Sequence, residues 1–157
     1  MMTSLCCEVL ERLAGKTLVT AESLTGGGIG AALTAIPGSS AVYKGGVICY
    51  TNWVKENILG VPGDVLETCG AVSEPVAKAM AEGARKLLRA DFAVSVTGLA
   101  GPGGDEYGNS VGTVCIGYAD ADTSFTRKVH FDGDRQEVRN QTIRAALETV
   151  LDRNPSV

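Results

Sequence analysis

The chain has 157 residues, enough for one domain (1–157), and its 45% hydrophobic and 20% charged residues are typical of a soluble globular protein. With a formal net charge of −4, a broad basic surface for DNA or RNA is not expected, but a local pocket for one phosphate is compatible with it. No apolar run approaches the roughly 20 residues that span a bilayer, and the N-terminus does not resemble a signal peptide. The sequence therefore predicts a cytoplasmic protein without nucleic-acid or membrane partners.

Neither a metal nor a cofactor is expected. The five cysteines are an odd number, two of them are adjacent, and no Cys-x-x-Cys spacing occurs, which argues against a disulfide framework and a structural zinc site. Asp105 and Glu106 are adjacent acids, but no histidine or carboxylate cluster accompanies them. The cysteines are Cys6, Cys7, Cys49, Cys69 and Cys115.

The first half of the chain alternates helical and extended patterns. In chain order we expect a helix capped by Ser4 and closed by Gly15, a strand over 17–21, a helix over 29–35, a strand over 46–50, a short helix capped by Asn52, and a helical piece from Pro62 to Cys69.

The second half adds a long helix and a late hairpin. In chain order we expect a helix that the Ser73 hydroxyl caps and that runs to Leu88, a strand over 91–97, a glycine-rich loop over 98–110, strands over 111–119 and 124–131, and a helix that 132–134 opens and Leu151 ends. This order predicts a three-layer α/β/α sandwich around a mixed, mostly parallel sheet of about five strands with a C-terminal hairpin.

Three strand ends are polar or glycine-rich, namely 22–28, 50–55 and 97–104. Ligands of open α/β sheets bind beyond the carboxyl ends of the strands, so we expect these segments to share one crevice. Ser23 stands in the first of them, between a strand and three consecutive glycines. It is a candidate nucleophile with an oxyanion hole at the turn, but the local pattern alone favours Ser23 or Thr25 as only a helix cap, because Ser and Thr so commonly cap helices.

A serine nucleophile needs a base within hydrogen-bond reach. His130 is the only histidine, and in an alternating strand it is better explained as a solvated or hydrogen-bonded side chain. Lys55 follows another strand end, where partial burial would lower its pKa enough to accept a proton; the alternative is a solvent-facing lysine. Glu22 is a further candidate, but adjacent residues of a strand point to opposite faces.

Other polar positions admit two interpretations each. Ser39 and Ser40 form either a turn or a hydroxyl pair in the crevice. Arg135, at the start of the last helix, either binds phosphate or pairs with neighbouring acids. The loop from Gly98 to Gly104 has no Walker lysine and no dinucleotide fingerprint, so it indicates only close passage of the backbone.

Five segments together resemble the CinA C-terminal domain family, the nicotinamide-nucleotide amidohydrolases. They are Thr-Ala-Glu-Ser-Leu-Thr-Gly-Gly at 20–27, Pro-Gly-Ser-Ser at 37–40, Tyr-Thr-Asn at 50–52 with Lys55, Gly-Ala-Val-Ser-Glu-Pro-Val at 70–76, and Thr-Gly-Leu-Ala-Gly-Pro at 97–102 continuing to Val-Gly-Thr-Val at 111–114. Phe-Asp-Gly-Asp-Arg at 131–135 looks like the family's closing motif.

The resemblance implies hydrolysis of the carboxamide of nicotinamide mononucleotide to nicotinate mononucleotide and ammonia, with Ser23 as nucleophile and Lys55 as base. A non-catalytic nucleotide-binding module linked to competence or DNA damage is the alternative, and a homo-oligomer such as a dimer is expected from the family. We place oxyanion donors in the Gly26-Gly27 turn by inference. The expected substrate-binding set is Thr25, Gly26, Gly27, Ser39, Ser40, Tyr50, Asn52, Thr97, Gly98, Gly101 and Arg135.

Two features depart from the family pattern. Members often carry Lys-Pro where Asn109-Ser110 stands here, so the loop end is expected to be more mobile and to lack that lysine's contacts. Many members also have an N-terminal domain resembling molybdopterin-binding proteins, whereas this sequence begins almost at the first expected helix and is interpreted as the stand-alone form.

Overall fold

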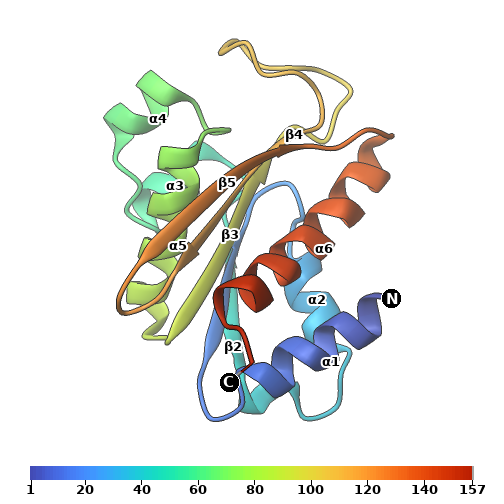
Figure 1. Cartoon of the computed structure of the whole chain (residues 1–157). Coiled ribbons are helices and arrows are strands. Elements are labelled where there is room, and N and C mark those ends of the chain that lie inside the picture. Colours follow the sequence, from blue (N-terminus) through green and yellow to red (C-terminus); the bar gives the residue numbers. More distant parts are fainter. Residues whose placement is uncertain (157) are drawn as a thin grey trace.

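A computed structural model describes residues 1–156 (Figure 1). Its elements are α1 (Met2–Arg12), β1 (Leu18–Glu22), α2 (Gly28–Thr34), the 3-10 turn η1 (Ser39–Ala41), β2 (Tyr43–Ile48), α3 (Asn52–Asn57), α4 (Gly63–Cys69), α5 (Glu74–Leu88), β3 (Phe92–Gly98), β4 (Thr113–Ala119), β5 (Ser124–His130) and α6 (Arg135–Arg153).

The strands form one five-stranded sheet in the order β2-β1-β3-β4-β5. β1 pairs in parallel with both β2 and β3, while β4 is antiparallel to β3 and to β5. Only β4 therefore runs against the other strands, which confirms the expected mixed sheet with a C-terminal hairpin. The connection from β1 to β2 runs through α2 on one face of the sheet, and the connection from β2 to β3 runs through α5 on the other face. Open α/β sheets bind ligands beyond the strand ends where the connections change face in this way.

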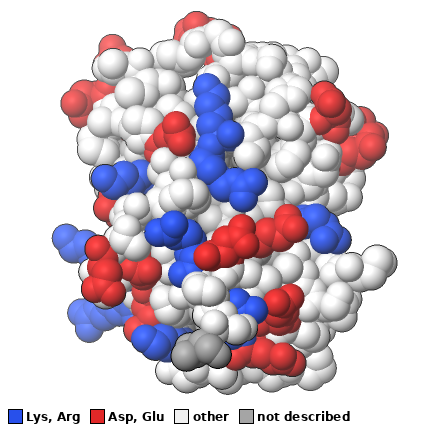
Figure 2. Space-filling model, viewed as in Figure 1, with Lys and Arg blue, Asp and Glu red and all other residues white. Residues whose placement is uncertain are grey.

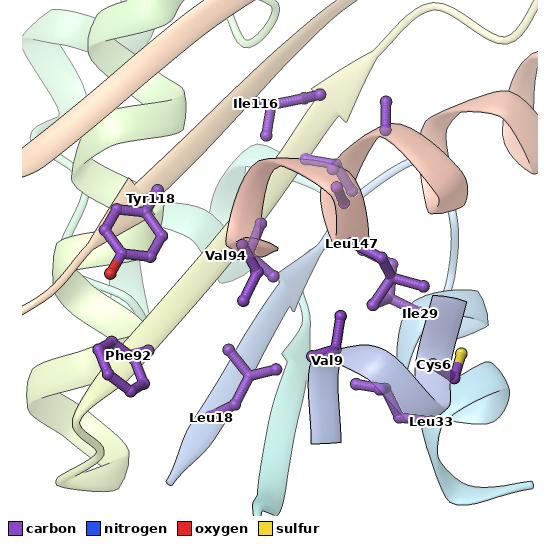
Figure 3. Packing of buried hydrophobic residues seen from close by; sticks show 14 of the residues in the cluster. Cys6, Val9, Leu18, Ile29, Leu33, Phe92, Val94, Ile116, Tyr118 and Leu147 are labelled. Carbon is purple, nitrogen blue, oxygen red and sulfur yellow. The ribbon is translucent and has the colours of Figure 1, made fainter. Parts of the chain in front are cut away.

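Helices cover both faces of the sheet, as expected for the α/β/α sandwich. One core cluster lies between the sheet and α1, α2 and α6; Leu18, Ile29, Val94 and Leu147 meet there (Figure 3). A second cluster, which includes Val19 and Met80, lies on the face that α5 covers. Because both faces are covered, all five residues of β1 are buried, including the polar Thr20 and Glu22.

Element ends differ from the expectations mainly at the caps. α1 begins at Met2, and the Ser4 hydroxyl donates to the Met1 carbonyl at 3.0 Å instead of capping the helix. Asn52 is the first residue of α3 rather than its cap, and the Ser73 hydroxyl, although Ser73 precedes α5, donates to the Gly70 carbonyl at 2.8 Å. At α6, by contrast, Asp134 accepts from the backbone of Glu137 in a full capping box.

Charges of both signs are interspersed on the face that carries α1 and α6, without a continuous basic surface (Figure 2). Among residues 1–156, no helix combines the length and apolar character needed to cross a membrane. The same residues contain no cluster of three potential metal-ligating side chains, and all five cysteines are free.

Candidate active site

Ser23 is the first residue after β1, at the edge of the sheet where the parallel strands end. Its backbone N–H donates to the Val96 carbonyl at 3.1 Å, and its carbonyl accepts from the Gly26 N–H at 3.1 Å. Gly26 and Gly27 then take φ values of +57° and +99°, which turn the chain directly into α2. The Ser23 residue is 7% exposed, so the turn presents a hydroxyl that is nearly buried.

Lys55 comes from α3 and meets this hydroxyl. Its Nζ lies 3.0 Å from Ser23 Oγ, 2.8 Å from the Cys49 carbonyl oxygen and 3.4 Å from the Tyr50 carbonyl oxygen. Lys55 is only 1% exposed, and no carboxylate among residues 1–156 forms an ion pair with it. Burial therefore lowers its pKa, an effect that Cys49 partly opposes.

The serine and the lysine face a cavity of about 320 Å³, within the range of small-molecule sites. Its lining joins all three of the expected strand ends and the start of α6: Ser23, Leu24, Tyr50, Asn52, Lys55, Ala71, Val72, Thr97, Gly98, Leu99, Ala100, Gly101, Gly103 and Arg135. A larger hollow of about 930 Å³ lies at the other end of the sheet, beside α1 and the β4–β5 turn. That hollow carries mixed charges but no nucleophile with a base, so the smaller cavity is the candidate site.

Six of the expected binding residues line this cavity, and Arg135 connects its two sides. Arg135 Nη1 donates to the Gly101 carbonyl at 2.6 Å, and Nη2 donates to Tyr50 Oη at 3.1 Å. The Thr97 hydroxyl donates to the Ala71 carbonyl at 2.8 Å, which ties the end of β3 to the segment between α4 and α5. The six are Tyr50, Asn52, Thr97, Gly98, Gly101 and Arg135.

Ser39 and Ser40 lie elsewhere. They belong to η1, which precedes β2, and the first residue of β2 pairs with Leu18 at the start of β1. Because parallel strands start at one edge of a sheet and end at the other, η1 lies at the edge opposite Ser23. The structure therefore assigns these two serines to the turn interpretation.

The glycine turn also differs from the expectation. The Gly26 N–H is occupied by the Ser23 carbonyl, and neither Gly26 nor Gly27 lines the cavity. Thr25 is fully buried and its hydroxyl donates to Glu22 at 2.7 Å, away from the cavity. Neither Ser23 nor Thr25 caps α2, whose N-cap is Gly27 without a side-chain bond.

Residues 2–153 match the family model described as the CinA C-terminal domain. This chain belongs to that family. A protein of Pseudomonas putida named nicotinamide-nucleotide amidohydrolase PncC is 46% identical over 134 residues, which cover 85% of this chain and 84% of that protein. A CinA-like protein of Parasynechococcus marenigrum is 48% identical over 150 residues, which cover 94% of this chain but 35% of that protein.

The chain spans 25% of the length of a CinA-like protein of Synechococcus sp. and 35% of that of the Parasynechococcus marenigrum protein. Among solved structures, a CinA superfamily protein of Enterobacter cloacae superposes with a TM-score of 0.95 at 34% identity, covering 99% of this chain and 93% of that one. The competence/damage inducible protein of Agrobacterium tumefaciens gives a TM-score of 0.94 at 40% identity, covering 98% of this chain and 96% of that one. These matches agree with the five-stranded α/β architecture of the CinA domain.

Arg139 was missed by sequence reasoning. It lies one helical turn beyond Arg135 in α6, and its Nε donates to the Leu24 carbonyl at 3.0 Å while Nη2 donates to the Thr25 carbonyl at 3.1 Å. It thus ties the turn after Ser23 in this CinA domain to α6. The spacing of four residues from Arg135 was the available signal, because residues four apart share a helix face.

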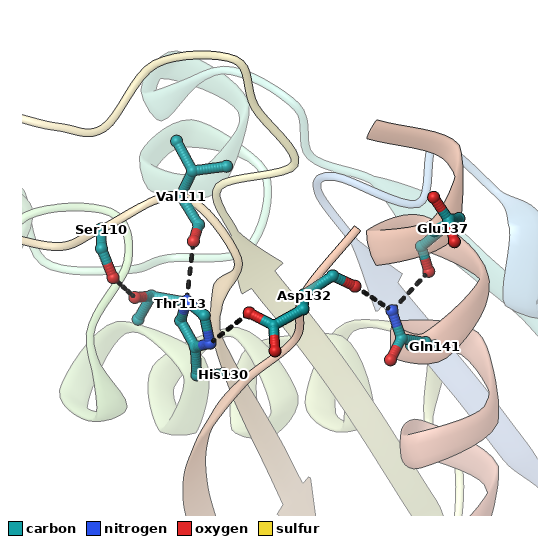
Figure 4. A network of polar contacts seen from close by, with 7 residues as sticks. All are labelled: Ser110, Val111, Thr113, His130, Asp132, Glu137 and Gln141. Carbon is teal, nitrogen blue, oxygen red and sulfur yellow. Dashed lines mark hydrogen bonds and ion pairs between the residues drawn. The ribbon is translucent and has the colours of Figure 1, made fainter. Parts of the chain in front are cut away.

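The loop between β3 and β4 projects beyond the end of the sheet (Figure 1). Side chains fasten it at several points. Asn109, for which the family resemblance implies a lysine, donates from Nδ2 to the Val72 carbonyl at 3.1 Å and to Asp105 at 2.8 Å. At the loop's end, His130 Nε2 lies 2.9 Å from the Val111 carbonyl (Figure 4). His130 therefore has a structural partner and does not line the cavity.

Proposed function

We propose that this CinA domain hydrolyses the carboxamide of nicotinamide mononucleotide, with Ser23 as nucleophile and Lys55 as its base. The observation that carries the proposal is the 3.0 Å separation of Lys55 Nζ and Ser23 Oγ at a cavity. A nucleophile and a base within this distance are the signature of covalent catalysis. The name of the Pseudomonas putida relative, nicotinamide-nucleotide amidohydrolase, supports the choice of a nicotinamide nucleotide as substrate.

The surroundings of Lys55 suit a neutral amine. A neutral amine has two N–H groups and one lone pair; the carbonyls of Cys49 and Tyr50 can accept the two N–H groups. The lone pair is then left for the Ser23 hydroxyl proton. Because burial lowers the pKa of Lys55, a larger share of the amine is neutral near pH 7 than for an exposed lysine.

In the proposed reaction, Ser23 Oγ attacks the carboxamide carbon and its proton passes to Lys55 Nζ. The tetrahedral intermediate collapses when the C–N bond breaks, and Lys55 returns the proton to the departing nitrogen, which leaves as ammonia. Water then attacks the ester on Ser23, giving its proton to Lys55, and the carboxylate product departs as Ser23 recovers its hydrogen. The sum is one amide and one water consumed, one acid and one ammonia formed.

We assign the oxyanion contact to the N–H of Leu24 in place of the Gly26-Gly27 amides. Leu24 lines the cavity directly after the nucleophile, and within residues 1–156 its N–H donates to no protein acceptor. The amide that follows the serine plays this role in other serine hydrolases. Arg135 is the proposed phosphate contact, because its guanidinium lies at the cavity mouth and can bind phosphate oxygens in pairs.

Ammonia release from nicotinamide mononucleotide tests the proposal. We expect activity in the wild type and a loss of at least about a thousandfold in Ser23→Ala and in Lys55→Ala, since members of such a unit fail together. Ser4→Ala and Lys44→Ala are matched controls at exposed positions outside the cavity, and both should retain full activity. An active Ser23→Ala protein refutes the mechanism. A wild type that binds the nucleotide without releasing ammonia identifies a non-catalytic binding module instead.

A further inference from the structure

Glu22 carries a buried carboxylate that is 2% exposed and that the reaction above does not use. Oε1 accepts from Thr25 Oγ1 at 2.7 Å and from the Ile29 N–H at 2.8 Å. Oε2 accepts from the Gly30 N–H at 3.0 Å and from Thr20 Oγ1 at 3.2 Å. The side chain therefore caps α2 from the end of β1, and two donors serve each of its oxygens.

Each oxygen faces one backbone N–H, which can only donate, so both oxygens of the Glu22 side chain act as acceptors. Thr20 gives its only hydroxyl proton to Glu22, so the Tyr43 hydroxyl, 2.7 Å from Thr20 Oγ1, must donate to Thr20. A chain of donors thus runs from Tyr43 through Thr20 to the carboxylate. Bonds from donors to a charged acceptor are about twice as strong as bonds between neutral groups.

The same residue is connected to both members of the catalytic pair. Its side chain holds Thr25, two residues beyond Ser23, so it closes the turn that contains the nucleophile. Its backbone carbonyl accepts from the Cys49 N–H at 2.9 Å, and the Cys49 carbonyl in turn accepts from Lys55 Nζ. Within residues 1–156, no contact joins the carboxylate to Ser23 Oγ, which excludes Glu22 as the base in this geometry.

We propose that Glu22 is a positioning residue for the catalytic pair, whose side chain holds the turn that places Ser23 Oγ against Lys55 Nζ. It does not line the cavity, so it acts through Ser23 and not on the substrate. This inference rests on the proposed function in requiring a reactive Ser23, but it does not depend on which amide is hydrolysed.

Glu22→Gln is the decisive variant. An amide has one oxygen where the carboxylate has two, so its NH₂ group must face two of the four donors and the turn relaxes. A misplacement of about 1 Å costs on the order of a hundredfold in rate, so we expect kcat to fall about 10- to 100-fold with KM changed less than about twofold. A role in folding alone would lower the melting temperature without this split between kcat and KM.

Asp91→Asn is the matched control. Asp91 Oδ2 accepts from the Thr17 N–H at 2.8 Å and from the Thr17 hydroxyl at 3.2 Å, just ahead of β1 and at the far end of that strand from Glu22. The same change of a carboxylate to an amide there should leave kcat and KM as in the wild type. A fall in kcat in Asp91→Asn equal to that in Glu22→Gln overturns the proposal.

A second readout separates this proposal from the choice of substrate. A fluorophosphonate reacts with an activated serine by forming a Ser23 Oγ–P bond as fluoride leaves and the serine proton is released, and mass spectrometry gives the rate. We expect Glu22→Gln to react at least about tenfold more slowly than the wild type. A wild type that reacts with the probe but releases no ammonia refutes nicotinamide mononucleotide as the substrate. The probe rates of the wild type and Glu22→Gln then still decide the proposal for Glu22.

Thr25→Val covers the case in which Glu22→Gln does not fold. It keeps the shape of a buried side chain and removes one of the four donors, and a lost bond of about 1 kcal/mol corresponds to roughly a fivefold slower reaction. Probe rates equal to the wild type in folded Glu22→Gln, or in Thr25→Val if only that variant folds, overturn the proposal. A wild-type Ser23 that is inert to the probe also overturns it, because there is then no activated serine to position.

Discussion

Replacing Lys55 with methionine tests whether the buried amine is neutral in the folded protein. Burial lowers the folded-state pKa of Lys55 below its unfolded value of about 10.4. Between these two values the unfolded chain binds more protons than the folded chain, so stability rises with pH. The slope reaches about 1.4 kcal/mol per pH unit where the amine is fully neutral in the folded state and fully protonated in the unfolded state. Lys55→Met lacks this contribution.

Urea unfolding of both proteins at pH 7, 8 and 9 gives the measurement. The free energy of unfolding of the wild type minus that of Lys55→Met should increase with pH, and groups common to both proteins cancel in the difference. The pKa of Cys49 is raised to about 11 by burial, so its thiol stays protonated in the folded state over this range. A difference that is flat or falls with pH refutes the reasoning, because Lys55 would then enter the site as an ammonium ion.

Two further variants test the phosphate contact and the core. Arg135→Ala should raise KM for nicotinamide mononucleotide about tenfold or more while changing KM for the riboside without phosphate less than about twofold, as measured by ammonia release from both substrates. Leu18→Ala, at a fully buried position between the sheet and α1, should lower the free energy of unfolding by about 2 to 5 kcal/mol in urea titrations.

Most strands and helices were predictable because they have a strong local pattern, as in the Leu-Val-Thr run of β1 or the Ser-Glu-Pro start of α5. The hydrogen bonds of the caps were not. Residue type identifies Ser4 and Ser73 as hydroxyls near a helix start, but both donate to a carbonyl and neither accepts from the helix. The start of β2 was missed by three residues because Gly45 and Gly46 weaken its strand pattern, and pairing with β1 overrides that weakness.

The site was predictable where it follows from topology. Tyr50 and Thr97 stand at the ends of the parallel strands β2 and β3, and Lys55 follows β2 in the short helix α3. Because parallel strands end at one edge of a sheet, these segments were expected to meet there. Ser39 and Ser40 have equally suitable hydroxyls, but their position depends on where the crossover from α2 re-enters the sheet. The partners of Glu22 likewise depend on how α2 packs, since alternation along a strand gives the direction of a side chain and not what it meets.

The proposed base, Lys55, is oriented by backbone carbonyls instead of by a third side chain. In a Ser–His–Asp triad a carboxylate holds the imidazole, whereas here the carbonyls of Cys49 and Tyr50 hold the Lys55 amine. A carboxylate in that place would stabilise the ammonium form and raise the pKa of the lysine, while carbonyls orient it without adding a full negative charge. The proposed pair therefore depends on the backbone path from Cys49 to Lys55, and the Glu22 carbonyl anchors that path to β1, the strand that precedes Ser23.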